Sequence, residues 1–238
     1  MIDMEVLIDG CSQMGIGLGE KQQYQFSRYL DLLLEWNQKF NLTAITEPKE
    51  IIVQHFLDSI STLKLKQMEG QSRILDMGSG AGFPGIPLKI MEPQLQVSLV
   101  DSVQKKVGFL NEIIEQLELN DTVAIHARAE DLANLKEQRE AYDLVVSRAV
   151  AELRVLSEYC LPFLKKDGHF ISHKGPGAAD EVELAKNAIK LLGGEWLETV
   201  EARIPYSDRT HNLIIIKKIK NTPKKFPRSP GKPRKDPL

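Results

Sequence analysis

The stretch RILDMGSGAGFPGIPL, residues 73–88, constrains the fold of this chain more than any other part of the sequence. A short apolar run is followed by four glycines within eight positions, and a second apolar stretch comes directly after them. A strand, a glycine-rich turn and a helix in this order open the ligand-binding unit of many α/β proteins, because glycine lets the backbone turn tightly and approach a ligand. The stretch therefore predicts a parallel sheet with a binding site at its first loop.

The rest of the chain continues the alternation of strands and helices. We expect helices at 85–91, 103–119, 153–168 and 178–192, the third closed by Gly168, and strands at 73–77, 96–101, 122–127, 142–149, 169–175, 195–204 and 211–219. This order predicts an α/β fold with a seven-stranded mixed sheet and helices on both faces. The last two strands have no helix between them, so we expect an antiparallel pair at one edge.

Three segments are expected along the chain. Residues 1–70 place apolar side chains at helical spacing, for example at Phe26, Leu30 and Leu33, and predict an N-terminal helical cap. Residues 71–220 form the α/β domain. Residues 221–238 are a basic, proline-rich tail.

The overall composition limits the classes of protein to which the chain can belong. With 42% hydrophobic and 27% charged residues, the chain belongs with globular rather than disordered or fibrous proteins. No apolar run reaches the length of a membrane span, and the first ten residues lack the pattern of a secretion signal, so we expect a cytoplasmic protein. Cys11 and Cys160 lie far apart and fit no metal-ligand spacing, which predicts neither a disulfide framework nor a metal site. We also expect a monomer.

Charge is distributed unevenly along the chain. The net charge is −2, yet residues 220–238 hold seven Lys or Arg and one Asp, so the remainder is acidic. Frequent prolines oppose helix and strand there, and we expect a mobile, extended cationic arm. Such an arm suits a polyanion such as RNA, because released counterions contribute to affinity, and it is equally typical of a solubilising terminus.

The glycine loop is compatible with two classes of ligand. A Walker-type phosphate loop is excluded, because Ile86, Pro87 and Leu88 stand where Lys and Ser or Thr are required. Gly80, Gly82 and Gly85 match the G-x-G-x-x-G pattern of dinucleotide-binding proteins, and Asp101 lies where a ribose-binding acid belongs.

Two features favour S-adenosylmethionine over a dinucleotide. Asp76 ends the first strand beside the loop, where a carboxylate would repel a pyrophosphate but favour a cationic ligand. The antiparallel ending of the sheet also departs from the dinucleotide fold. On this interpretation Gly78, Gly80 and Gly82 admit the methionine and ribose part of the donor, Asp101 accepts the ribose hydroxyls, and Phe83 lies against the donor.

Six segments in this order carry a resemblance to a known family: LLLEWNQKFNLTAIT, HFLDSI, ILDMGSGAGFPGIPL, RAEDL, VVSRAVAEL and HKG. They closely resemble the RsmG (GidB) family, bacterial methyltransferases that modify N7 of a guanine in 16S ribosomal RNA, and the similarity runs over nearly the whole chain. The resemblance implies a class I, Rossmann-like methyltransferase fold, S-adenosylmethionine as cofactor and 16S RNA or the small-subunit particle as partner. It implies donor contacts at Gly78, Phe83, Ala129, Glu130 and Arg148.

The residues alone leave the role of RAED open. Acidic residues at a helix N-terminus favour the helix dipole and need no further function. An acid after the third strand is equally placed to receive an adenine amino group.

Methylation at N7 needs no general base, because N7 presents a lone pair without a proton. Candidates for positioning the acceptor are Arg148, Lys174 and Arg209, each just past a strand on the side where ligands bind in such sheets. A basic residue that helps must hold O6 or phosphate and leave N7 free.

Further positioning candidates lie in the helical cap. His55, Asp58 and Ser59 share one helical face, and this arrangement opposes a hydrolase triad because their side chains point side by side. Asn41 and Thr43 are typical of a turn with a helix cap, while the resemblance places their segment near the site.

Three other functions remain compatible with the sequence. The acidic body suits a small-molecule methyltransferase, and the glycine pattern suits an NAD-binding oxidoreductase. A non-catalytic RNA-binding or assembly factor with a vestigial donor site is the third.

Overall fold

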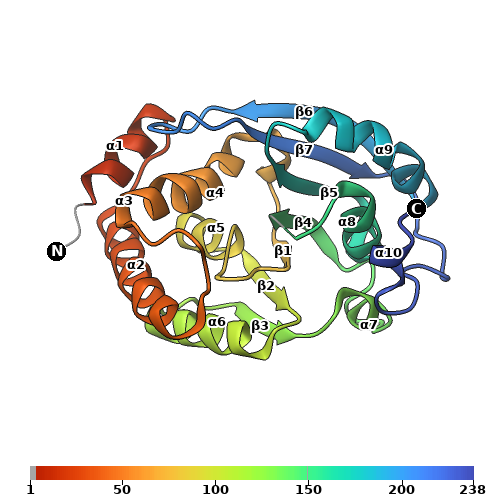
Figure 1. Cartoon of the computed structure of the whole chain (residues 1–238), viewed down its shortest axis with the longest axis horizontal. Helices are drawn as coiled ribbons and strands as arrows, with labels where there is room; N and C mark the ends of the chain where they lie inside the picture. The colour runs from red at the N-terminus through yellow and green to blue at the C-terminus, as the bar shows by residue number, and fades with distance from the viewer. Residues whose placement is uncertain (1–3, 149) are drawn as a thin grey trace.

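A seven-stranded sheet forms the centre of the molecule in the computed structural model, which describes residues 4–148 and 150–238 (Figure 1). The strand order is β3-β2-β1-β4-β5-β7-β6. The strands are β1 (Arg73–Met77), β2 (Gln96–Asp101), β3 (Thr122–His126), β4 (Tyr142–Arg148), β5 (Leu164–Lys174), β6 (Gly194–Ala202) and β7 (His211–Lys218). The first five are parallel, and β7 pairs antiparallel with β5 and β6. The mixed sheet and its antiparallel edge pair are confirmed.

Alternating apolar side chains bury both faces of the sheet. In β4, Leu144 and Val146 join the hydrophobic core on one face, and Val145 joins the core on the other. Helices α5 (Gly85–Met91) and α6 (Gln104–Gln116) belong to the first core, and α7 (Ala129–Leu132), α8 (Leu153–Cys160) and α9 (Ala178–Leu191) belong to the second. The predicted helices on both faces are therefore present.

The N-terminal helices pack on the first core. They are α1 (Glu5–Gln13), α2 (Glu20–Phe40), α3 (Pro48–Ile51), a π-helical turn (Ile52–Leu57) and α4 (Asp58–Ser61), followed by 3₁₀ turns at Thr62–Lys64 and Lys66–Met68. Tyr29 of α2 stacks on Phe83 of the glycine loop at 5.4 Å between ring centroids, and its hydroxyl donates to the Ala81 carbonyl at 2.5 Å. The cap thus supports the glycine loop directly.

One predicted helix boundary is wrong. Helix α8 ends at Cys160, a 3₁₀ turn covers Leu161–Phe163, and β5 begins at Leu164, so Gly168 lies inside a strand and closes no helix. Pro162 explains the early stop, because proline removes a helical donor. Gly168 also fits the strand for a steric reason: a β-carbon there would lie 2.7 Å from the Asp143 carbonyl oxygen of β4. Ala149, the last residue of the expected fourth strand, lies outside the described residues.

The expectation of a mobile, extended tail is wrong. Residues 221–238 pack against the second core, where Phe226 is buried, and include the short helix α10 (Lys232–Lys235). Arg228 forms an ion pair with buried Glu158 at 2.7 Å, and Arg139 donates to the carbonyls of Thr222 and Phe226. The prolines exclude long regular elements, but they do not prevent packing.

Two smaller features complete the fold. Cys11 and Cys160 are buried free thiols. Among the helices of residues 4–148 and 150–238, none has the length and apolar character needed to cross a bilayer.

Candidate functional site

Two pockets open at the carboxyl ends of the parallel strands, where ligands bind in open α/β sheets. The first, about 320 Å³, lies at the ends of β1, β2 and β3. It brings together four of the residues expected to bind the donor: Gly78, Asp101, Ala129 and Glu130. Apolar side chains of Met77, Val100 and Val150 complete much of its wall.

The glycines of the loop have positive φ angles of 74°, 61° and 100° at Gly78, Gly80 and Gly82. Side chains rarely adopt this conformation, so the tight turn itself requires glycine. A β-carbon on Gly78 would also collide with Val150, and one on Gly82 would lie 2.7 Å from the Tyr29 hydroxyl. Backbone shape and packing thus account for these glycines, and of the three only Gly78 lines the pocket.

Two carboxylates at the first pocket are mostly buried, each with 6% exposure. Asp101 accepts the Gly80 N–H at 3.0 Å and the Val103 N–H at 2.8 Å, which fixes its carboxylate between the loop and the end of β2. Glu130 accepts the Gly231 N–H at 2.9 Å through Oε1. Since a carboxylate oxygen carries more than one lone pair, both acids retain capacity for a ligand donor.

Asp76 does not line the pocket. It is fully buried beneath the loop, where Oδ2 accepts the Gly85 N–H at 2.9 Å and Oδ1 has no hydrogen-bond partner among the described residues. Burial raises the pKa of this carboxyl to about 7. The position of Asp76 supports a role in holding the loop, whereas direct contact with a donor remains a prediction.

The second pocket, about 750 Å³, lies beyond the ends of β4 and β5 and under the β6–β7 loop. Five of the residues predicted to position the acceptor line it: His55, Asp58, Arg148, Lys174 and Arg209. They come from the π-helical turn and α4 of the cap, from two strand ends and from the loop before β7.

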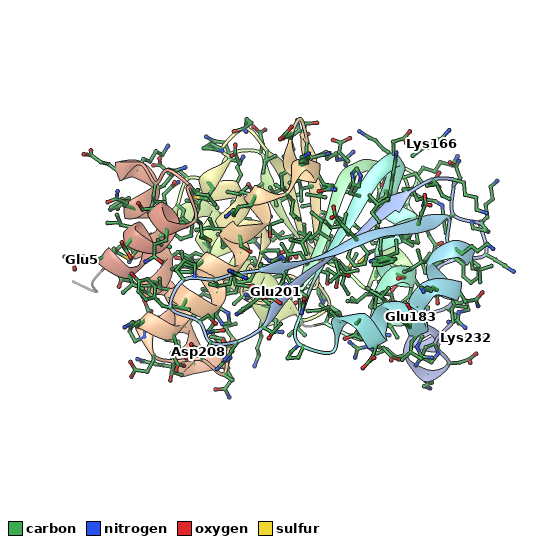
Figure 2. The ribbon with its side chains drawn as sticks, turned by 90° about the horizontal axis from the view of Figure 1, so that it is seen from above. Glu5, Lys166, Glu183, Glu201, Asp208 and Lys232 are labelled. Carbon is green, nitrogen blue, oxygen red and sulfur yellow. The ribbon has the colours of Figure 1, made fainter. Side chains whose placement is uncertain are left out.

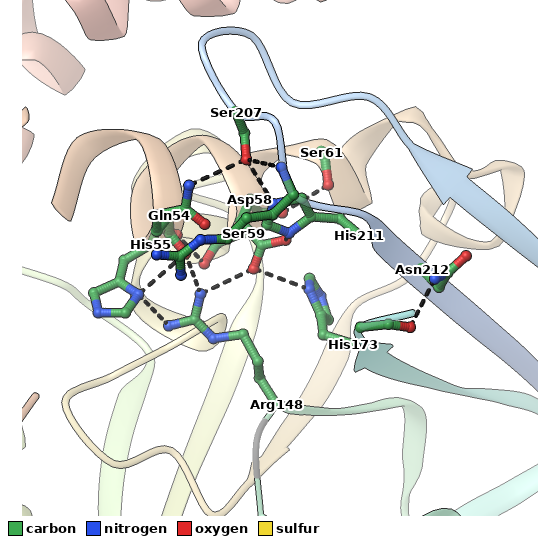
Figure 3. Close-up of polar contacts among 12 residues, drawn as sticks. Gln54, His55, Asp58, Ser59, Ser61, Arg148, His173, Ser207, His211 and Asn212 are labelled. Atoms are coloured by element: carbon green, nitrogen blue, oxygen red, sulfur yellow. Dashed lines mark hydrogen bonds and ion pairs between the residues drawn. The ribbon is translucent and has the colours of Figure 1, made fainter. Parts of the chain in front are cut away.

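Asp58 is the centre of a polar group that we call the Asp58 cluster: buried Asp58 and His173 with half-buried Arg148 and His211 (Figure 3). Its carboxylate lies 2.9 Å from Arg148 Nη1, 2.9 Å from His211 Nδ1 and 3.4 Å from His173 Nδ1. Burial opposes the charge of Asp58, yet interactions with His173, His211 and Arg148 hold its pKa well below the usual range. Asp58 therefore carries a fixed negative charge.

Arg148 is held by the cap as well as by Asp58. Its guanidinium donates to the Gln54 carbonyl at 3.0 Å, lies 3.0 Å from His55 Nδ1 and covers the Phe83 ring at 4.8 Å from the centroid. Gln54 and His55 both belong to the π-helical turn, a wide turn that often occurs at functional sites.

His55 is neutral at physiological pH. Burial, together with the nearby Arg148 charge, lowers its pKa to about 3. Because Arg148 only donates, His55 Nδ1 accepts from it, and Nε2–H then donates to Thr43 Oγ1 at 2.9 Å. Thr43 thus acts through His55, without reaching the pocket itself.

The remaining predicted residues differ in their availability. Lys174 donates to the Ala151 carbonyl at 2.6 Å and pairs with Glu181 at 2.7 Å, whereas the side chain of Arg209 is exposed. Ser59 is fully buried and donates to the His55 carbonyl. Asn41 caps α2 with a φ of 46° and is exposed. Neither Ser59 nor Asn41 lines either pocket.

The sequence did not predict several lining residues. His173 lies one residue before the end of β5, and His211 begins β7, so their places next to strand ends were the available signal. Tyr159 of α8, with Gly231 and Arg234 of the tail, lines the first pocket and had no such signal.

Both pockets reach the end of β4. Arg148 lines the second and Val150 lines the first. A ligand in each would therefore approach the other across this strand end, which is the arrangement that a group transfer between two bound molecules requires.

Comparisons with known proteins give a consistent result. Residues 22–214 match the family model described as GidB, rRNA small subunit methyltransferase G. The chain is 48% identical to the ribosomal RNA small subunit methyltransferase G of Alkaliphilus metalliredigens (strain QYMF), over 98% of each chain. It is 50% identical to the protein of the same name from Lachnoclostridium phytofermentans, over 100% of this chain and 98% of that one.

Solved structures support the fold. M. jannaschii TYW2, determined in complex with AdoMet, superposes with a TM-score of 0.52 at 19% identity and covers 68% of this chain and 77% of its own. At this identity the similarity concerns the fold alone, which is the Rossmann-like α/β fold of class I methyltransferases.

Proposed function

This chain belongs to the rRNA small subunit methyltransferase G family, and from this premise we propose that it transfers the methyl group of S-adenosylmethionine to N7 of a guanine in 16S ribosomal RNA. The observation that carries the proposal is the pair of pockets that both reach the end of β4. One holds the acids suited to a cationic nucleoside donor, and the other holds cations and histidines suited to RNA.

The first pocket is proposed to bind the donor. Asp101 accepts the ribose hydroxyls and Glu130 accepts the adenine amino group, while Ala129 and Val100 contact the base. Gly78, whose missing β-carbon leaves the pocket open beside Val150, admits the methionine part.

The second pocket is proposed to bind the acceptor guanine and its backbone. Arg209, exposed at the rim, contacts phosphate, and Lys174 and Arg148 line the floor near the base. Asp58 and His55 fix the orientation of the Arg148 guanidinium, and the Asp58 carboxylate partly compensates its positive charge. Because the Asp58 carboxylate compensates the Arg148 guanidinium, Arg148 repels less strongly the positive charge that the guanine acquires on methylation.

No residue of the chain needs to remove a proton in this reaction, since N7 attacks through a lone pair. S-adenosylmethionine supplies an activated methyl group when bound. The residues of the two pockets hold nucleophile, methyl and sulfur in line, and orientation of this kind contributes roughly 7–11 kcal/mol in favourable cases.

The decisive experiment measures transfer of a labelled methyl group to purified 16S RNA and to 30S particles that lack the modification. Borohydride reduction and aniline treatment then cleave the RNA at N7-methylguanine. We expect label in at least one substrate and cleavage at a single site.

Label without cleavage would assign methylation to another atom. Donor binding without label in either substrate would favour a small-molecule acceptor or a non-catalytic role, and NADH binding without affinity for S-adenosylmethionine would favour an oxidoreductase.

A further inference from the structure

The C-terminal tail forms part of the wall of the first pocket. Gly231 and Arg234 line it together with Gly78 and Glu130. In Figure 1, α10 lies beside α8 on the side of the sheet away from the cap, and Figure 2 places Lys232 of α10 far from Asp208 of the β6–β7 loop. The tail therefore belongs to the first pocket and is remote from the loop that covers the second.

This wall is firmly held. The Arg228 side chain donates to both carboxylate oxygens of Glu158, at 3.0 Å from Nε to Oε1 and 2.7 Å from Nη2 to Oε2, and Glu158 is only 1% exposed. Three residues further on, the Gly231 N–H donates to Glu130. These two contacts fix residues 228–231 of the tail against Glu158 of α8 and Glu130 of the pocket.

Arg234 is exposed and lies beside Val150 on the wall of the pocket. Its Nη2 lies 3.4 Å from the Val150 carbonyl, and the Val150 side chain faces Gly78. Arg234 also interacts with the Tyr159 hydroxyl, whose pKa is raised by burial and by Glu130. A guanidinium has five N–H donors, and the long contact with Val150 leaves most of them for a ligand.

The donor offers one anionic group, the α-carboxylate of its methionine part. Among the residues that line the pocket, the other cation is Arg128, which precedes Ala129 and Glu130 at the end assigned to the adenine. Arg234 contacts Val150, whose side chain faces Gly78, and arginine binds carboxylates through two parallel hydrogen bonds.

We propose that Arg234 binds the α-carboxylate of S-adenosylmethionine, so that the folded tail completes the donor site. This inference rests on the proposed function, because it takes the first pocket as the donor pocket. It gives the tail a role in donor binding, in place of the RNA-binding or solubilising role that its composition suggests.

Two ligands distinguish the carboxylate from the rest of the donor. S-adenosylmethionine carries the amino acid, and 5′-methylthioadenosine lacks it but keeps the adenine and ribose. We would measure both dissociation constants by isothermal titration calorimetry on the full chain, on Arg234→Ala and on Lys235→Ala, a matched control that removes the neighbouring charge outside the pocket.

The expected result is an about 10-fold or larger loss of S-adenosylmethionine affinity in Arg234→Ala with unchanged 5′-methylthioadenosine affinity. Lys235→Ala should bind both ligands as the unaltered chain does. Equal weakening of both ligands, or no weakening, overturns the role of Arg234 while leaving the proposed function in place. Failure of the unaltered chain to bind S-adenosylmethionine overturns the proposed function and this inference together.

Discussion

Replacing Asp58 with asparagine tests the Asp58 cluster. Asp58 is 4% exposed and accepts from Arg148 and His211, each at 2.9 Å. An asparagine of the same shape keeps one acceptor oxygen but directs an amide N–H₂ at one of these two donors, and it leaves the Arg148 charge without a counter-ion. Removing one partner of a buried ion pair costs about 3–5 kcal/mol.

Thermal unfolding and ligand binding measure the two consequences separately. For a chain of this size the loss corresponds to a Tm roughly 6–20 °C lower, followed by circular dichroism. Affinity for S-adenosylmethionine should not change, because Asp58 lies outside the first pocket, while methyl transfer to RNA should fall. Glu35→Gln is the matched control, since it removes an exposed ion pair with Lys39 and should leave the Tm unchanged.

A double variant tests the cause. If the cost arises from an uncompensated guanidinium, Arg148→Met should destabilise the unaltered chain more than it destabilises the Asp58→Asn background, with a coupling of about 0.5–3 kcal/mol. Strictly additive effects, or an Asp58→Asn variant as stable as the unaltered chain, would refute the electrostatic account of the cluster.

Three further predictions follow from the geometry. The raised pKa of Asp76 means that the folded state binds more protons than the unfolded state between about pH 4 and 7, so the free energy of unfolding falls as pH rises through this range. The stability of Asp76→Asn, compared with that of the unaltered chain, should therefore be higher at pH 8 than at pH 5. An equal difference in unfolding free energy at both pH values would contradict this prediction. Arg209→Ala should reduce the salt dependence of RNA binding by about one unit of log–log slope without changing donor affinity, whereas exposed Arg203→Ala, outside the pocket, should leave the slope unchanged. Gly78→Ala should abolish donor binding in calorimetry, because φ is 74° and the new β-carbon meets Val150; normal affinity would show that the loop adapts.

The sequence predicted the sheet because each strand carries its own signal. Apolar runs such as RILDM and QVSLVD are bounded by glycine or polar residues, and parallel strands bring their carboxyl ends to one edge. Gly78 follows β1 and Asp101 ends β2, so their convergence on one pocket could be predicted from their order along the chain. Glu130 follows β3, and only the family resemblance assigned it to the donor.

The contacts within the Asp58 cluster had no comparable signal. Asp58 and His211 lie 153 residues apart, and only the packing of the cap on the sheet brings them within 2.9 Å. The π-helical turn that presents Gln54 and His55 is also invisible in an apolar pattern of ordinary helical spacing. Long-range contacts of polar residues depend on tertiary structure that local preference does not encode.

The composition of the tail gave a wrong prediction because a few specific contacts determine the structure of this segment. Its prolines and charges are those of an extended arm, yet Phe226 supplies apolar burial and Arg228 finds a buried acid on α8. Both additions to the common α/β sheet therefore act at its carboxyl edge: the cap supplies Asp58 and His55 to the second pocket, and the tail supplies Arg234 to the first. The cap and the tail thus add specific residues to a sheet that many distant proteins share. Variants confined to the cap should alter acceptor binding, and variants confined to the tail should alter donor binding, each without affecting the other.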